Sequence, residues 1–288
     1  MTAAVEALAP PSPELVEHDI RRALEEDLGT GDVTADLLPA GARATARVVT
    51  REPMVLCGRD WFDACFRHLD PAIGIVWRFA DGEHVAAGAI LCEMSGSAAA
   101  LVSGERTALN FLQTLSATAT TTARYVDAVS GTRTTVLDTR KTLPGLRLAQ
   151  KYAVRAGGGS NHRQGLHDAI LIKENHIAAC GSITAAVRRA RELHPGIMAE
   201  VEVENFAELR EAIDAGADRI MLDEFDRDDL ARAVTEVAGR VPLEISGSVA
   251  LDRMRSIADS GVDYVSVGAL TKHVRAIDLS MRVELDTP

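Results

Sequence analysis

The sequence predicts an α/β fold in which a smaller N-terminal α/β module precedes an α/β barrel. From Thr132 onward, short apolar runs alternate with amphipathic helical segments, and successive runs begin roughly 21–36 residues apart. Such alternation is typical of right-handed βαβ units and a parallel sheet. Six strands are clear, fewer than the eight of a full TIM barrel, so the pattern fits an incomplete barrel or a doubly wound sheet.

Composition sets limits on the function. The chain has 288 residues, a formal net charge of -11, 47% hydrophobic residues and 25% charged residues. An acidic chain is a poor candidate for nucleic-acid binding, and no apolar run approaches the ~18 residues of a membrane span. The four cysteines form no CxxC pair, and residues 1–13 have no signal-peptide pattern. We therefore expect reduced core thiols, a short disordered N-terminal tail and a cytoplasmic protein.

The first module is predicted to mix helices and strands. Apolar residues recur at helical spacing up to Leu28, and Gly29 follows as a stop signal. The remaining elements are a helix and three strands separated by turns. The expected ranges are a helix at 14–28, a strand at 44–50, a helix at 61–69, and strands at 81–85 and 88–92.

A long helix is expected to begin at Ser103 and to reach about Val129. Ser103 is a suitable N-cap, and Glu105 suits the positive end of the helix dipole. Arg106 does not suit that end, which indicates either a tolerated surface arginine or an anionic partner. Residues 116–122 are small or β-branched, so close packing must hold this part of the helix.

The barrel is predicted from alternating segments. The expected strands are 133–139, 168–173, 198–204, 219–223, 242–246 and 263–267. The expected helices are 146–156, 182–193, 205–215, 227–238 and 250–259.

Basic residues gather where these runs end, although the chain as a whole is acidic. They are Arg140, Lys141, His162, Arg163 and Lys173. Strand C-termini converge in parallel α/β folds, so these side chains predict one local anion site rather than scattered surface charges.

Valine and glutamate alternate strictly through one expected strand, which places Glu200, Glu202 and Glu204 on one face. On an edge strand this face would be solvated. On a central barrel strand the carboxylates would point inward and need cations or a metal. We favour the inward reading, with Lys141 and Lys173 as the cations.

Two acidic residues at strand ends form a candidate metal pair. Asp223 ends a run as Glu202 does, although an N-cap or a loop aspartate would look the same. Together the two carboxylates could hold Mg²⁺ through water, or accept hydrogen bonds from sugar hydroxyls.

The last two expected strands end in glycine-containing turns, where barrels often seat a phosphate. The residues are Ser246, Gly247, Ser248, Val267, Gly268 and Ala269. A third glycine run, at 157–159, reads as a helix C-cap leading to Asn161, although a phosphate-binding nest is the alternative.

These residues carry a resemblance to a known family. The chain resembles the decarboxylating quinolinate phosphoribosyltransferases along nearly its whole length. The matching stretches, in family order, are 26–34 (EDLGTGDVT), 105–113 (ERTALNFLQ), 138–142 (DTRKT), 151–155 (KYAVR), 157–163 (GGGSNHR), 171–177 (LIKENHI), 200–204 (EVEVE), 221–223 (MLD) and 244–247 (EISG).

The resemblance implies an N-terminal α/β sandwich domain, 1–116 with the C-terminal tail 277–288, and an open α/β barrel, 117–276. It implies that quinolinate and 5-phosphoribosyl 1-pyrophosphate react, with Mg²⁺, to give nicotinate mononucleotide, pyrophosphate and CO₂. It further implies a homodimer or an assembly of dimers, with no nucleic-acid or membrane partner.

The resemblance also implies a role for each candidate residue. The quinolinate site would comprise Arg106, from the neighbouring subunit, with Thr139, Arg140, His162, Arg163 and Lys173. Lys141 would lie near the reacting centre, and Glu202 and Asp223 would handle the ribose and Mg²⁺. The turns at 246–248 and 267–269 would seat the 5-phosphate.

Two other functions fit parts of the pattern. A lysine that ends an apolar barrel strand, Lys173, suits a Schiff-base aldolase. A binding protein for anions would also use the cations, because fold alone does not fix function, but it has no evident need for Glu202 and Asp223.

Overall fold

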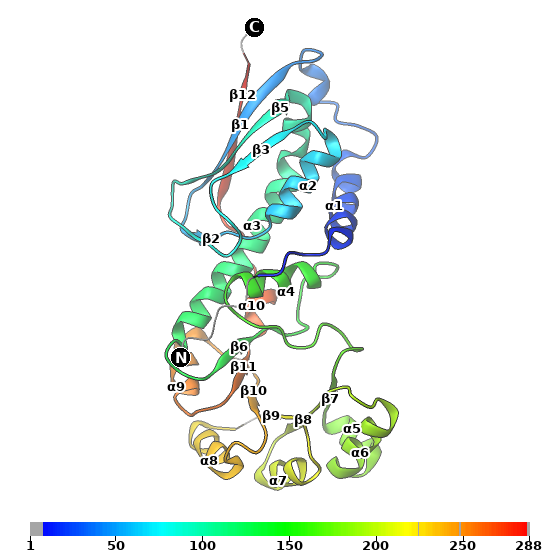
Figure 1. Ribbon diagram of the computed structural model, residues 1–288, viewed down its shortest axis with the longest axis vertical. Coiled ribbons are helices and arrows are strands. Elements are labelled where there is room, and N and C mark those ends of the chain that lie inside the picture. The colour runs from blue at the N-terminus through cyan, green and yellow to red at the C-terminus, as the bar shows by residue number, and fades with distance from the viewer. Residues whose placement is uncertain (1–7, 224, 248, 287–288) are drawn as a thin grey trace. The chain divides into compact units, whose positions relative to one another are not determined.

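The computed structural model describes residues 8–223, 225–247 and 249–286 and divides into two compact units. The first unit contains residues up to 123 together with 143–158 and the chain from 273 onward. The second contains 124–142 and 159–272. The sequence prediction had placed 143–158 in the barrel domain. Figure 1 labels the helices and strands along the chain.

The first unit is built on an antiparallel sheet of four strands in the order β12-β1-β5-β3. The C-terminal strand β12 pairs with β1 along its length, so the C-terminal tail joins the N-terminal domain, as predicted. A two-stranded sheet pairs β2 with β4. The strands are β1 (Arg43–Thr50), β2 (Met54–Val55), β3 (Gly74–Trp77), β4 (His84–Val85), β5 (Ile90–Ser97) and β12 (Leu279–Leu285).

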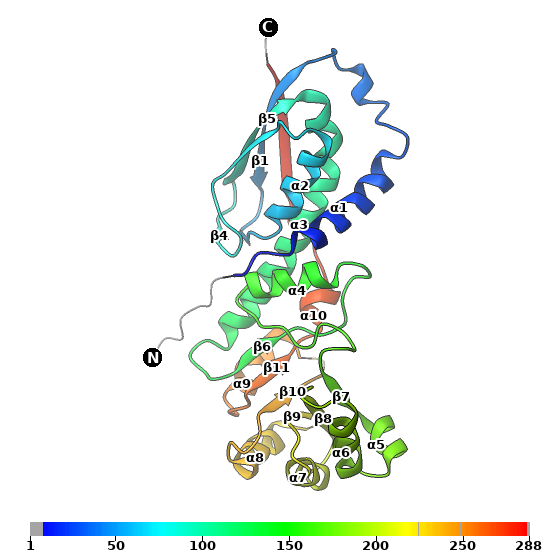
Figure 2. The ribbon, with the colours of Figure 1, turned by 45° about the vertical axis from the view of Figure 1, so that its right-hand side comes forward.

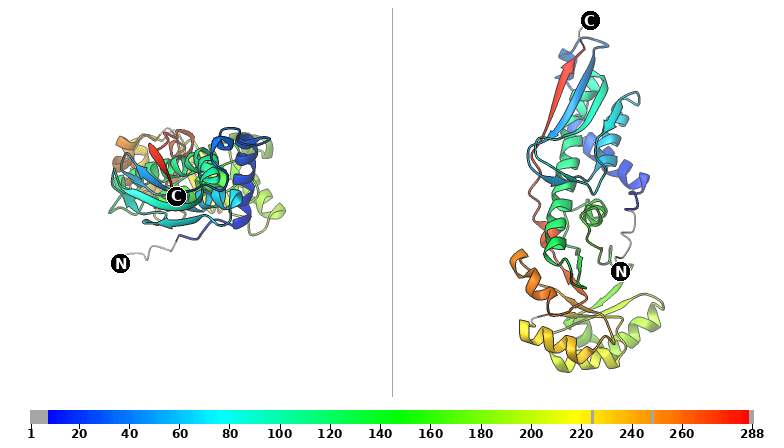
Figure 3. Two further views of the ribbon diagram at one scale, coloured as in Figure 1. Left: turned by 90° about the horizontal axis from the view of Figure 1, so that it is seen from above. Right: turned by 60° about the vertical axis from the view of Figure 1, so that its left-hand side comes forward.

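Helices α2 and α3 of this unit lie against one face of the four-stranded sheet (Figure 3). Alternate residues of β1, Ala44, Ala46 and Val48, are buried beneath them, as period-2 patterning requires. The helical elements are α1 (Pro13–Leu28), the 3₁₀ turn η1 (Ala35–Leu37), α2 (Arg59–Leu69), α3 (Ala98–Ala128) and α4 (Arg147–Ala156).

The predicted start of the long helix was wrong. Helix α3 begins at Ala98, where Ala98 and Leu101 are buried in the core, so it starts five residues before the expected cap. Ser103 is an interior residue whose hydroxyl donates to Asp32 at 2.7 Å. Arg106 therefore lies well inside the helix and is exposed. It is not at the positive end of the helix dipole, so the predicted conflict with that dipole does not arise.

Packing holds the small-residue part of α3, as predicted. The hydroxyl of Ser116 accepts from Cys57 N–H at 3.0 Å, and the hydroxyl of Thr120 accepts from Val55 N–H at 2.8 Å. Both side chains are buried. Side-chain hydroxyls thus satisfy backbone groups that no sheet partner reaches.

The second unit is a parallel sheet in the order β6-β11-β10-β9-β8-β7. Each strand from β7 to β11 pairs with the next along the chain, and β11 returns to β6 (Figure 2). Strands β6 and β7 are the two ends, so the sheet is an open barrel of TIM-like type, as predicted. The strands are β6 (Thr135–Leu137), β7 (Ile170–Ile172), β8 (Ala199–Val203), β9 (Arg219–Leu222), β10 (Leu243–Ile245) and β11 (Tyr264–Ser266).

Helices follow the barrel strands in the expected places. They are α5 (Glu174–Cys180), α6 (Ile183–Leu193), α7 (Phe206–Asp214), α8 (Arg227–Val237), η2 (Leu251–Arg253), α9 (Met254–Ala258) and α10 (Ala269–Lys272). Helix α5 was not predicted, and neither were strands β2, β3 and β12 of the first unit. Three cysteines are free and buried, but Cys180 is exposed, so only three of the four thiols lie in the core. None of the helices within the described residues has the length and apolar character that a membrane span requires.

Candidate active site

The carboxyl ends of the barrel strands bring most of the predicted site residues to one edge of the sheet. Because all six strands are parallel, the residues that follow them share that edge. These residues are Arg140 and Lys141 after β6, Lys173 after β7, Glu202 within β8, Asp223 after β9, Ser246 and Gly247 after β10, and Val267, Gly268 and Ala269 after β11. Arg106 belongs to the first unit, and Ser248 lies outside the described residues.

Two arginine side chains lie near each other at this edge. Desolvation and the nearby charge of Arg140 lower the pKa of Arg163. The Nη1 of Arg163 donates to the carbonyl oxygen of Ala169 at 3.3 Å. Two like charges in partly desolvated surroundings are stabilised by an anion between them. This arrangement suits a carboxylate or phosphate ligand, which planar guanidinium groups bind in two-point fashion.

Lys173 is the cationic partner of Glu202. Its Nζ lies 2.5 Å from Glu202 Oε2, and the two side chains are 43% and 11% exposed. The sequence reading that a lysine would meet a barrel carboxylate therefore holds for Lys173. An ammonium in contact with a carboxylate acts as a charge partner, whereas a Schiff base needs the free amine. The geometry thus does not favour the aldolase.

Among the residues that the structure describes, those that hold Lys141 do so through its backbone. Its N–H donates to the hydroxyl of Thr139 at 3.1 Å, and its carbonyl accepts from the hydroxyl of Thr271 at 2.8 Å. A Cβ placed on Gly268 would lie 3.1 Å from Lys141 Cδ, so the absence of a side chain there leaves room for the lysine stem. The Lys141 side chain is exposed at the open edge, where it can meet an anion.

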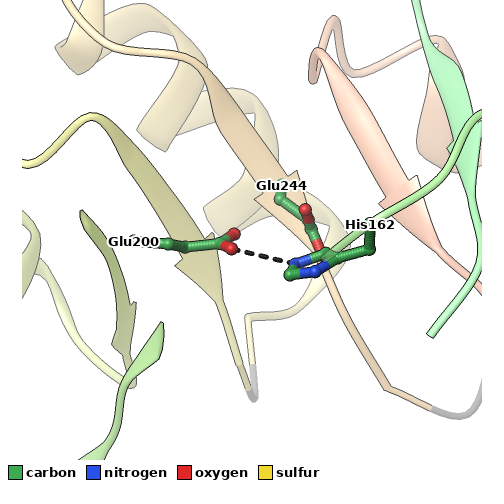
Figure 4. Close-up of side chains that lie close together, drawn as sticks. All are labelled: His162, Glu200 and Glu244. Atoms are coloured by element: carbon green, nitrogen blue, oxygen red, sulfur yellow. Dashed lines mark ion pairs between the residues drawn. The ribbon is translucent and has the colours of Figure 1, made fainter. Parts of the chain in front are cut away.

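His162 points into the barrel, toward two buried glutamates (Figure 4). Its Nε2 lies 2.9 Å from Glu200 Oε2 and 3.6 Å from Glu244 Oε1. His162 is 8% exposed and both glutamates are fully buried. The second oxygen of Glu244 accepts from Arg219 at 3.0 Å. The cluster therefore joins strands β8, β9 and β10 to the segment that carries His162.

The three groups of this cluster could in principle hold a metal, since their ligand atoms lie within 4.8 Å of one another. However, Nδ1 of His162 accepts a hydrogen bond from the backbone N–H of Arg163 at 2.7 Å. A neutral ring then carries its proton on Nε2, which leaves that atom without a lone pair for a metal. The cluster is better described as a buried set of close contacts between one imidazole and two carboxylates.

Glu202 and Asp223 offer the oxygen donors that Mg²⁺ prefers. They lie at the ends of adjacent strands, with Asp223 N–H bonded to the carbonyl of Val203 at 3.0 Å. Both side chains are partly exposed at the open edge. The pair fits an ion that keeps several waters and also touches substrate phosphates.

The two predicted phosphate turns lie on adjacent strands, β10 and β11. Gly247 has φ +138°, a conformation that glycine adopts without strain. The turn after β11 leads directly into α10. Their position agrees with a phosphate seat, and their binding role remains a prediction.

Comparison with known proteins identifies the family. Residues 32–116 match the N-terminal domain of quinolinate phosphoribosyl transferase, and residues 118–282 match its C-terminal domain. The "Probable nicotinate-nucleotide pyrophosphorylase [carboxylating]" of Bacillus subtilis is 41% identical over 261 residues, 90% of each chain. The chain belongs to the quinolinate phosphoribosyltransferase family.

Other relatives agree over nearly the whole length. The nicotinate-nucleotide pyrophosphorylase of Mycobacterium leprae is 43% identical over 91% of this chain and 95% of its own. The structure of the Francisella tularensis pyrophosphorylase matches with a TM-score of 0.92 and 46% identity, covering 97% of this chain and 99% of that one. NadC from Streptococcus pyogenes matches with a TM-score of 0.94 and 39% identity, over 97% and 100%.

Sequence reasoning missed two kinds of residue. Glu244 was noted only as part of a family motif, yet a charge in the middle of an apolar strand was a signal for an internal partner. Thr271 gave no signal, because a hydroxyl that donates to a backbone carbonyl far away in the chain, here that of Lys141, leaves no pattern in the sequence.

Proposed function

We propose that this protein transfers the phosphoribosyl group of 5-phosphoribosyl 1-pyrophosphate to quinolinate, with decarboxylation, to give nicotinate mononucleotide, pyrophosphate and CO₂. Two observations support the proposal: the ion pair of Lys173 with Glu202 on neighbouring strands of the barrel, and the proximity of the Arg140 and Arg163 charges. Membership of the family supports the same reaction.

The cations account for recognition of the first substrate. Quinolinate carries two carboxylates on adjacent ring carbons, so it needs two neighbouring cationic groups. Arg140 and Arg163 repel each other in the free protein, and a dianion between them relieves that repulsion. Bound in this way, the ring is fixed with its nitrogen toward the sugar.

The acids account for the transfer step. Attack by the ring nitrogen on C1′ expels pyrophosphate, and positive charge develops on the ribose as the bond to the leaving group lengthens. The carboxylates of Glu202 and Asp223 stabilise that charge, and the ammonium of Lys141 stabilises the departing pyrophosphate. Mg²⁺, held through water by Glu202 and Asp223, would neutralise the phosphates of the donor.

Decarboxylation follows from the new bond. The quaternised ring nitrogen accepts the electron pair released when the bond between C2 and its carboxylate breaks. CO₂ leaves, and C2 then takes up a proton. A positively charged ring is therefore required before the carboxylate can depart.

The proposal also covers the assembly of subunits, the compartment and the cofactor. We infer a homodimer or an assembly of dimers in which Arg106 of one subunit contributes to the quinolinate site of its neighbour. The exposed position of Arg106 on α3 is compatible with this role. We also infer that the enzyme works in the cytoplasm with Mg²⁺ as its cofactor.

The direct test is turnover by the purified protein. Quinolinate, the pyrophosphate donor and Mg²⁺ should give nicotinate mononucleotide and CO₂ in equal amounts. Nicotinate, which has only one carboxylate, is the matched control and should react poorly. Absence of both products over a range of pH and Mg²⁺ concentration would rule out the proposed reaction.

A further inference from the structure

We propose that Glu200 and Glu244 are positioning residues of the diacid site and that they act through His162. This inference rests on the proposed function, because the group they orient belongs to the quinolinate site. Neither glutamate reaches the open edge, since both are fully buried in the barrel interior.

The segment that carries His162 is fastened to the end of the barrel sheet. Ser160 forms a parallel bridge with Leu137 of β6, so the chain continues the sheet by a single step. The carboxylate of Asp138 then accepts from the side chain of Asn161 at 2.6 Å and from His162 N–H at 2.9 Å. The backbone on one side of the histidine is therefore fixed to β6.

The ring of His162 reaches from this segment to the opposite strands. Its Nε2 faces Glu200 on β8 and Glu244 on β10, whose carboxylates come from strands two apart in the sheet (Figure 4). Arg219 on β9, between these strands, contacts Glu244 and stacks on Tyr264 with 4.2 Å between its guanidinium carbon and the ring centre. The His162 side chain thus links the segment next to β6 with strands β8 and β10.

The second ring nitrogen of His162, Nδ1, contacts the backbone of Arg163. Because its N–H donates to Nδ1 of His162, the ring holds the main chain of the arginine from the inside. That bond requires an unprotonated Nδ1, so the Nε2–H must point toward the carboxylates. The two carboxylates hold a proton on Nε2, and, against the lowering effect of burial, they raise the pKa of His162.

Electrostatic interaction also couples Glu200 to Arg163. The carboxylate of Glu200 stabilises the cationic form of Arg163, whereas burial and Arg140 oppose it. Glu200 is therefore linked to the arginine both through the imidazole and through its field.

The test compares kinetic constants of paired variants. Glu200→Ala leaves the buried Nε2–H without its nearest acceptor, and we expect the KM for quinolinate to rise about 10-fold to 100-fold. The KM for the pyrophosphate donor should change less than about 3-fold. Glu200→Gln keeps an acceptor oxygen of the same size and should restore most of the quinolinate affinity.

Glu244 is tested in the same way. Glu244→Gln should give a smaller rise in the quinolinate KM, because its oxygen lies farther from Nε2, at 3.6 Å. Glu236→Gln removes a charge from an ion pair with Arg210 in the same unit and serves as the control. Equal changes in both KM values, or none in any variant, would overturn the proposal.

A spectroscopic measurement is independent of turnover. In protein labelled with ¹⁵N-histidine, His162 (assigned from His162→Gln) should show a protonated Nε2 and an unprotonated Nδ1. Glu200→Ala should shift it toward a mixture of tautomers. A protonated Nδ1 in the wild type would refute the proposed contacts of the His162 ring, whether or not the enzyme turns over. If the wild type lacks turnover, the proposed function fails, and calorimetric binding of quinolinate replaces KM in the comparison.

Discussion

Replacing Glu202 with glutamine should abolish most turnover while leaving the fold nearly as stable as before. Glu202 faces the open edge of the barrel, and its partner Lys173 is 43% exposed. The lysine side of this pair is open to water, Glu202 itself is 11% exposed, and glutamine keeps an acceptor for the ammonium, so we expect the substitution to cost no more than about 1 kcal/mol of stability. In the proposed reaction the same carboxylate stabilises the positive charge that develops on the ribose, which we expect to be worth about 3–4 kcal/mol in the transition state, or a 10²–10³-fold loss in kcat.

The assay measures initial rates with both substrates at saturation, together with unfolding in urea. We expect kcat to fall at least 100-fold and the free energy of unfolding to change by less than about 1 kcal/mol. Glu204→Gln, on an exposed residue just beyond the same strand, is the matched control and should keep normal rates. A near-normal kcat in Glu202→Gln would refute the role given to this carboxylate.

Three further predictions concern stability. Thr120→Val leaves the buried N–H of Val55 without its acceptor and should lower the free energy of unfolding by about 1–3 kcal/mol in urea titrations. Gly157→Ala puts a Cβ 2.3 Å from the carbonyl oxygen of Ala119, so we expect a loss of about 3 kcal/mol and a lower Tm; an unchanged Tm would contradict this. Burial raises the pKa of Glu244 from 4.5 to about 7, so the folded state binds a proton more tightly than the unfolded chain. The free energy of unfolding should therefore fall as pH rises from about 4.5 to about 7, and Glu244→Gln should flatten that fall.

Much of the barrel could be predicted because most of its elements, α5 excepted, carry a local signal. Strands β6 to β11 are short apolar runs, and the helices between them have amphipathic spacing and recognisable ends, such as Ser182 before α6, whose hydroxyl accepts from Ala185 N–H. The parallel order then follows from the alternation itself. The edge at which the strand ends meet was therefore available from the sequence.

The misses have a common physical cause, which is that tertiary contacts override local signals. Ser103 looks like an N-cap, but burial of Ala98 and Leu101 extends α3 past it, and Asp32 takes its hydroxyl. Gly157 is the C-cap of α4, as predicted, but nothing in the sequence indicated that α3 packs directly on it.

The edge of the barrel that carries the candidate residues was predicted more completely than the pairings of their side chains. Lysines were expected to meet the barrel glutamates, and Lys173 does meet Glu202. The partner of Glu200 is instead His162, from a segment 38 residues earlier in the chain. The spacing of residues in the sequence does not show which of several cations contacts a given buried acid, because that depends on how the strands are staggered.

The claim at the centre of this account is that separate basic side chains grip one diacid at the open edge of the barrel. A crystal structure with quinolinate bound tests it most directly. We predict that Arg140 and Arg163 contact its carboxylates, and that the ring nitrogen faces Glu202 and Asp223. Quinolinate bound elsewhere, or held at this edge without contact to either arginine, would contradict it.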